Sequence, residues 1–153
     1  MPMPKLTIDI QFASPALEKA VTTIASAALI KKWVRNTLHC DGLITLRFVN
    51  PNEGKQLNSH FRNKDKATNV LTFPYELSGS HVVADIIFCW PVIKQEAKEQ
   101  HKDLKAHLAH LIIHGCLHSQ GFDHEYEKEA QKMEAREVAL LKSLGFSNPY
   151  API

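Results

Sequence analysis

The sequence predicts a small α+β domain in which one mixed sheet of about four strands packs against helices. Three observations support this fold class. Stretches with the two-residue period of strands lie in the first part of the chain, helical stretches lie between them, and the chain from Pro91 onward reads as helical. The 153 residues, 44% of them hydrophobic, are enough for one domain spanning residues 1–153 and too few for two ordinary domains.

Local signals locate the elements of the first half. Residues 5–12 alternate apolar and polar side chains, which is the period of a half-buried strand. Ser14 followed by Pro15 is typical of a helix N-cap and first helical residue, and Gly42 precedes a second apolar stretch. The expected elements are a strand at 5–12, a helical stretch from 15 to 38 that is broken within 22–26, a strand at 43–49 and a short helix at 50–61.

Prolines and a glycine divide the second half. A strand is expected to stop at Pro74, and Pro91 is placed to start a helix. Asp103 is a suitable N-cap for the next helix, and Gly145 is a suitable end for the last one. The expected elements are a strand at 69–73, a loop at 76–80, a strand at 82–89 interrupted by Asp85, and helices at 91–101, 104–120 and 125–144.

Composition excludes several classes of protein. With 18 Lys and Arg residues against 16 Asp and Glu residues, the net charge of +2 argues against a strongly basic tail and an acidic disordered chain. The three cysteines form no Cys-x-x-Cys pair, which argues against a disulfide framework and a thiolate zinc site. Because no apolar run is long enough for a signal peptide or a membrane span, we expect a soluble, cytoplasmic protein with no membrane partner.

Positive charge is concentrated in one segment. Residues 31–66 contain eight basic side chains and three acidic ones. One side of the molecule is therefore a candidate surface for a polyanion, with an ordinary solvated face as the alternative that charge alone favours.

Histidines cluster in one short stretch. Six of the nine lie within 24 residues, in a stretch that ends with HGCLHSQGFDH at 114–124. His114 and His118 are four residues apart, so on a helix they differ by ~40° and project from one face. Gly121 can adopt a left-handed conformation that ends the helix and returns the chain, which would bring His124 to the same ion. Three imidazoles leave a fourth position open for water, so the pattern predicts a catalytic site for one zinc ion, or for nickel or another divalent transition metal.

The angle around the helix distinguishes three neighbours of this pair. Cys116 lies ~200° from each histidine, so its thiol is expected to point away from the ion. His107 and His110 continue the face of His114 and His118. They are either partners that orient a ligand or bridge to the substrate, or ordinary buried histidines of the core.

The zinc pattern overlaps the HExxHxxGxxH sequence of metzincin proteases at every ligand and at the glycine. Where those proteases have the glutamate that serves as general base, this chain has Gly115. A bound ion still acidifies water, but any base must come from another residue. Peptidase activity is therefore the weaker interpretation.

Several separated motifs resemble one known family. HGCLHSQGFDH is close to HGxLHxxGYDH of the bacterial YbeY-type endoribonucleases, also described as rRNA maturation factors, with Phe122 in place of tyrosine. The resemblance covers most of the chain from about residue 40 onward and departs from the family at Ala84, where glycine is usual. The other matching motifs are Leu57-Asn58 with Arg62, KATNVLTFPYE at 66–76, Asp85-Ile86 and the terminal LGFSNPY.

The resemblance implies a metal-dependent, single-strand-specific endoribonuclease that matures ribosomal RNA, notably the 3′ end of the small-subunit RNA, and takes part in ribosome quality control. Besides the rRNA precursor, it implies small-subunit ribosomal proteins and a ribosome-assembly GTPase as partners. By the same resemblance, His114, His118 and His124 hold the metal, and Arg62 and His114 are the catalytic residues.

The residue types suit this chemistry. Cleaving a phosphodiester concentrates negative charge on non-bridging oxygens, and the planar guanidinium of Arg62 can contact two of them at once, which lysine cannot. We expect single-stranded RNA in a groove between the strand edge and the metal-bearing turn, with Arg62, Lys64 and Lys66 along its phosphates. The nucleophile is either water or the neighbouring 2′-hydroxyl.

Alternatives remain open for some residues and for the function. Asp85 is either a buried structural carboxylate or a group near the ion, and Asp123 either orients a ligand histidine or caps the following helix. Thr68 and Asn69 either line the cleft or only hold the loop and strand edge in place. The alternative functions are a zinc hydrolase of another bond and a ribosome-assembly factor whose metal is structural.

Overall fold

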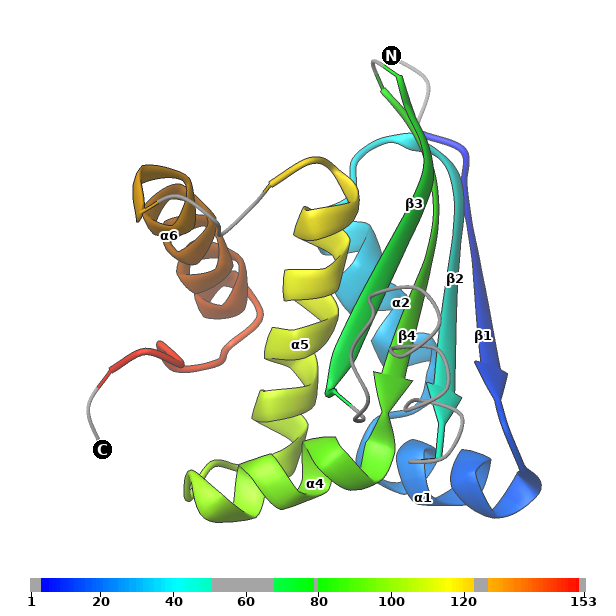
Figure 1. The fold of residues 1–153 in the computed structure, drawn as a ribbon, viewed down its shortest axis with the longest axis vertical. Helices are drawn as coiled ribbons and strands as arrows, with labels where there is room; N and C mark the ends of the chain where they lie inside the picture. The colour runs from blue at the N-terminus through cyan, green and yellow to red at the C-terminus, as the bar shows by residue number, and fades with distance from the viewer. Residues whose placement is uncertain (1–3, 51–67, 79, 123–126, 152–153) are drawn as a thin grey trace.

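The computed structural model describes residues 4–50, 68–78, 80–122 and 127–151. Within these ranges, one four-stranded sheet has the spatial order β1-β2-β4-β3 (Figure 1). The strands are β1 (Leu6–Phe12), β2 (Asp41–Val49), β3 (Val70–Ser78) and β4 (His81–Cys89). β1, β2 and β4 run parallel and β3 runs antiparallel to β4, so the predicted mixed sheet and the α+β class are confirmed.

Serine side chains cap the first two helices. Oγ of Ser14 accepts a hydrogen bond from the N–H of Leu17 at 3.1 Å, which confirms the predicted N-cap. Ser26 caps the next helix in the same way, so the helical stretch is broken where expected. The helix predicted at 50–61 lies outside the described residues. The described helices are α1 (Pro15–Ile24), α2 (Ala27–Thr37), α4 (Trp90–Glu99), α5 (Leu104–Ser119) and α6 (Glu127–Ser143).

Two helices cover one face of the sheet. α2 and α5 lie side by side on this face, and α6 packs against α5 on the side away from the sheet (Figure 1). Alternate residues of β2 and β4 point into the core between sheet and helices, as the two-residue period of a strand requires. These buried residues are Ile44, Leu46, Phe48, Val82, Ala84, Ile86 and Phe88.

α5 carries four of the six clustered histidines through the middle of the molecule. Its N-cap is Asp103, as predicted, because this carboxylate accepts a hydrogen bond from the N–H of Ala106 at 3.0 Å. Eleven of the 16 residues of α5 are buried, so polar side chains among them need partners inside the protein. No helix in the described part of the chain is both long enough and apolar enough to cross a membrane.

The predicted end of the third strand at Pro74 is wrong. β3 continues through Pro74 to Ser78, which pairs with His81 of β4, and the register shifts between Pro74 and Glu76. β3 is an edge strand, where a proline without an N–H donor is tolerated, and the shift accommodates it. The loop predicted at 76–80 is therefore strand as far as Ser78.

Gly42 lies inside β2 rather than before it. Its φ of +134° is a conformation that L side chains rarely adopt, and a Cβ there would lie 1.8 Å from the carbonyl oxygen of Val82. Glycine at this position therefore allows β2 and β4 to approach each other where their pairing begins.

Candidate metal centre

His114 and His118 project from the same face of α5. Their ring centroids lie 6.5 Å apart and their ring planes differ by 10°, so the shared face predicted from the spacing is confirmed. Both side chains are only partly buried, and that of His114 is 30% exposed. The pair therefore lies where solvent reaches the C-terminal half of a mostly buried helix.

α5 ends just beyond this pair, at Gly121. The N–H of Gly121 bonds to the carbonyl of His118 at 3.1 Å, and the N–H of Phe122 bonds to that of Leu117 at 3.2 Å, which is the Schellman pattern of a helix end. Gly121 has a φ of +95°, which confirms the predicted left-handed glycine.

Five predicted residues lie outside the described residues, namely Arg62, Lys64, Lys66, Asp123 and His124. Among the residues that are described, no group of three His, Cys, Asp or Glu side chains is arranged to hold a metal ion. His114 and His118 are therefore two candidate ligands, and His124 as the third stays a prediction.

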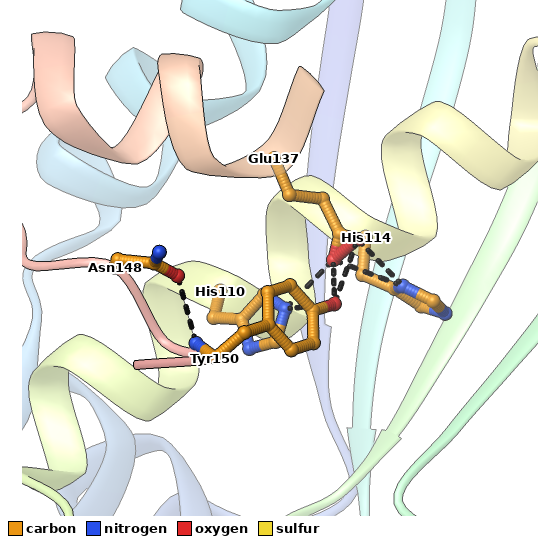
Figure 2. Close-up of polar contacts among 5 residues, drawn as sticks. All are labelled: His110, His114, Glu137, Asn148 and Tyr150. Atoms are coloured by element: carbon orange, nitrogen blue, oxygen red, sulfur yellow. Dashed lines mark hydrogen bonds and ion pairs between the residues drawn. The ribbon is translucent and has the colours of Figure 1, made fainter. Parts of the chain in front are cut away.

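A buried carboxylate from another helix contacts His114. Glu137 of α6 is fully buried and receives hydrogen bonds from three side chains (Figure 2). Nε2 of His110 donates to Oε1 at 2.7 Å, and the hydroxyl of Tyr150 donates to the same oxygen at 2.8 Å. Nδ1 of His114 lies 3.3 Å from Oε1 and 3.4 Å from Oε2. Glu137 thus connects α5, α6 and the C-terminal segment.

The contact with Glu137 selects the tautomer of His114. A carboxylate only accepts hydrogen bonds, so Nδ1, which faces Glu137, carries the proton of the neutral ring. Nε2 is then the unprotonated nitrogen, which is the form that a metal ion binds. At zinc sites a carboxylate behind a histidine commonly orients the ring and raises its basicity. The donors on this face of α5 therefore fit a divalent transition metal.

The surroundings keep Glu137 ionised. Burial by itself raises the pKa of this carboxyl group, but the hydrogen bonds from His110 and His114, with their electrostatic attraction for the carboxylate, outweigh burial and lower the pKa to about 2. Burial and the adjacent carboxylate raise the pKa of Tyr150, so its hydroxyl stays protonated and donates to Glu137.

His107 and His110 have different partners. His110 is buried and shares Glu137 with the candidate ligand, so it belongs both to the core and to the surroundings of the site. His107 is also buried, and its Nε2 lies 3.2 Å from Oε1 of Glu96 on α4. Asn69 donates to the same carboxylate at 3.0 Å. His107 and Asn69 therefore connect α4, α5 and the start of β3, which is a structural role.

Gly115 faces the sheet. A Cβ at this position would lie 2.8 Å from Cγ2 of Ile86 and 3.5 Å from Cγ1 of Val70. The site at which metzincins have their glutamate is thus filled by side chains of β3 and β4, and a larger residue would overpack it. This packing argues against peptidase chemistry that depends on a base at Gly115.

Cys116 points into the core, as predicted from its angle on the helix. It is fully buried, and burial, with a smaller contribution from Cys40, raises the pKa of its thiol. A thiol that stays protonated is a poor metal ligand. Cys116 is therefore excluded from the candidate site.

We expect Cys116 to resist thiol reagents in the folded protein. Because all three cysteines are buried, reagents reach them only in rare openings of the structure, so labelling should be slower by roughly 100-fold or more than in denaturant. Mass spectrometry after alkylation with iodoacetamide identifies the labelled residue, and protein in guanidinium chloride is the control. Fast labelling of Cys116 without denaturant would contradict its burial.

Asp85 lies on the face of the sheet that points away from α5. Its neighbours Ala84 and Ile86 belong to the core on the α5 side, and the alternation of a strand turns Asp85 the other way. Its Oδ2 accepts a hydrogen bond from the hydroxyl of Tyr75 at 2.9 Å. The contact with Tyr75 supports the structural option for Asp85, which is a partly buried carboxylate.

Glu137 is absent from the residues predicted for the site. A signal for it exists in the sequence, because Glu137 falls four residues after Met133 and three before Leu140, both of which are buried on α6. It therefore stands on the apolar stripe of the helix. A charged residue on such a stripe needs a buried partner, and the nearest histidine-rich helix supplies it.

Known proteins resemble the chain over nearly its whole length. A family model described as Endoribonuclease YbeY matches residues 6–145. A protein named Endoribonuclease YbeY from Polynucleobacter asymbioticus is 68% identical over 146 residues, which is 95% of this chain and 94% of that protein. Another of the same name from Acidovorax sp. is 47% identical over 152 residues, which is 99% of each chain.

One solved structure shares the fold. The solution structure of TM1509 from Thermotoga maritima matches with a TM-score of 0.55, covering 95% of this chain and 100% of that one. The two sequences are 23% identical, so this likeness concerns the fold alone.

Proposed function

Because this chain belongs to the YbeY endoribonuclease family, we propose that it cleaves single-stranded RNA with the help of a bound metal ion during the maturation of ribosomal RNA. Membership makes the chain an endoribonuclease, which is a hydrolase of phosphodiester bonds within RNA. The proposal adds the metal, the 3′ end of the small-subunit rRNA as substrate, and a role in ribosome quality control. Small-subunit ribosomal proteins and an assembly GTPase are the proposed partners.

One observation carries the metal part of the proposal. The carboxylate of Glu137 lies behind Nδ1 of His114, while His118 projects from the same face of α5. His114, His118 and His124 would hold one zinc ion, or nickel or another divalent transition metal. When bound, such an ion acidifies water and stabilises negative charge on phosphate oxygens.

The side chains of the protein would position the RNA and neutralise its charge. Arg62 would contact two non-bridging oxygens of the reacting phosphate with its planar guanidinium. Lys64 and Lys66 would follow the neighbouring phosphates. Gly115 packs against Ile86 and supplies no base, so the proton of the nucleophile must go to another residue or to the substrate.

Three substrates of one sequence test this function. They are a single-stranded RNA that spans the 3′ end of the small-subunit rRNA precursor, the same RNA annealed to its complement, and the corresponding DNA strand. We expect the single-stranded RNA to be cleaved at least ~10-fold faster than the duplex, because its bases and backbone can adapt to the protein surface. Equal rates on both RNAs would contradict the single-strand preference. Equal cleavage of the DNA would exclude attack by the 2′-hydroxyl.

Replacing Arg62 with glutamate is expected to lower kcat/KM for the single-stranded RNA by about 100-fold, because losing one well-placed donor to a developing negative charge costs roughly that much. Lys19→Glu makes the same change of charge on the exposed surface of α1 and serves as the control. It should leave the rate within about 2-fold, since distant surface charges are screened by salt. Full cleavage by Arg62→Glu, in a preparation free of other nucleases, would overturn the proposed phosphate contact.

A further inference from the structure

The C-terminal segment that follows α6 returns to α5 beside the candidate metal centre. α6 ends in a left-handed glycine, Gly145, which turns the chain back. The ring of Phe146 then packs edge-on against Trp33 of α2, with ring centroids 5.8 Å apart. The segment is thus held to the core at its start, and it runs past α5 as far as Tyr150 (Figure 2).

Tyr150 contacts this part of α5 and α6 through both its ring and its hydroxyl. The ring lies edge-on to His110, with centroids 5.3 Å apart. The hydroxyl donates to Glu137, 2.8 Å from Oε1 and 3.1 Å from Oε2. The backbone N–H of Tyr150 donates to Oδ1 of Asn148 at 2.8 Å, which holds the turn that presents the tyrosine (Figure 2).

The hydrogen bonds that Glu137 receives are unequal. Those from His110 and Tyr150 are 2.7 and 2.8 Å long, whereas Nδ1 of His114 lies 3.3 and 3.4 Å from the two oxygens. The two short bonds therefore determine where the carboxylate lies, and the longer contact with His114 depends on that position. Of the two, only the bond from Tyr150 comes from outside the pair of helices α5 and α6.

We infer that Tyr150 is a positioning residue for the metal centre, because its hydroxyl holds the carboxylate of Glu137 where that carboxylate orients the ring of His114. The inference rests on the proposed function in one respect, namely that His114 binds the metal ion. The C-terminal segment then completes the site without touching the ion. Side chains that orient metal ligands typically change metal affinity by 10- to 100-fold. Losing the hydroxyl alone should therefore weaken zinc binding by about 10-fold.

The test is Tyr150→Phe, which removes the hydroxyl and keeps the ring. We expect its zinc dissociation constant, measured by competition with a chromogenic chelator, to rise by about 10-fold. The absorption spectrum of the cobalt-loaded protein should also change, because it depends on how the ligands are oriented. Tyr75→Phe is the matched control, since it removes a tyrosine hydroxyl that bonds a carboxylate, Asp85, at 2.9 Å on the far face of the sheet. The control should keep the wild-type affinity and spectrum.

The outcomes separate this inference from the proposed function. If Tyr150→Phe protein is less stable without metal, yet binds zinc and cobalt as the wild type does, the hydroxyl has only a structural role. This outcome would overturn the inference and leave the proposed function in place. Equal weakening of zinc binding in Tyr150→Phe and Tyr75→Phe would also overturn it. Wild-type protein that binds neither zinc, cobalt nor nickel would overturn both the proposed metal centre and the inference.

Discussion

Replacing His114 with alanine is expected to slow RNA cleavage by on the order of 10³-fold while the protein stays folded. A metal ion stabilises the transition state by several kcal/mol, and losing about 4 kcal/mol corresponds to three factors of ten in rate. The fold should tolerate the change because the His114 side chain is 30% exposed and alanine favours a helix. The measurements are the initial rate on the single-stranded precursor, the zinc content and the far-UV circular dichroism spectrum.

The control for this variant is His39→Ala, which removes an exposed histidine just after α2. It should bind zinc and cleave RNA as the wild type does. An assembly factor with a structural metal would behave differently, because His114→Ala would then unfold or lose its binding to the ribosome. Cleavage at the wild-type rate by nuclease-free His114→Ala protein would show that His114 has no part in the reaction.

Replacing Glu137 with alanine is expected to destabilise the protein by about 3–5 kcal/mol and to weaken zinc binding by about 10- to 100-fold. The substitution leaves the donors of His110 and Tyr150 without their acceptor, and removing one partner from a buried ionic contact costs roughly this much. Zinc binding weakens because His114 loses the carboxylate that orients it. Urea denaturation of the metal-free protein measures the first effect, and chelator competition measures the second.

Two further variants test why Glu137 matters: Glu134→Ala removes a carboxylate at another place on α6, and Glu137→Gln removes the charge at the same place. Glu134→Ala removes a carboxylate from the exposed side of α6 and should change the free energy of unfolding by less than about 0.5 kcal/mol. Glu137→Gln keeps the size of the side chain and one acceptor oxygen, so we expect a smaller loss than in Glu137→Ala, of about 1–3 kcal/mol. If Glu137→Ala were as stable as Glu134→Ala, Glu137 would not hold α5, α6 and the C-terminal segment together.

Much of the candidate site is predictable because its signals are local. Asp103 caps α5 through a bond to Ala106, and Gly121 ends the helix through bonds to the preceding turn. The shared face of His114 and His118 follows from the pitch of a helix alone. Each of these features depends on residues within about one or two helical turns, so the sequence contains it directly. Arg62 and His124 lie outside the described residues and stay predictions.

The errors and the open alternatives concern the place of a residue in the sheet. Pro74 reads as the end of a strand, yet an edge strand accommodates it with a shift of register. For Asp85 the sequence leaves a structural role and a role near the ion both open, and only the sheet shows that the residue lies on the face away from α5 and bonds to Tyr75. Which strand forms the edge, and which face the helices cover, depends on how distant segments pair.

Local patterns in the chain are sufficient to predict the order along the chain of the described strands and helices, the helix caps, and the shared face of His114 and His118. They are not sufficient for the surroundings of that pair, since Glu137 is 23 residues from His114 and 13 from Tyr150. These three side chains meet because α6 packs on α5 and the following segment folds back over both. Burial of apolar surface drives that packing, and it is non-directional, so it does not specify in advance which polar groups will face each other. The tertiary structure therefore made Glu137 and Tyr150 part of the candidate metal centre.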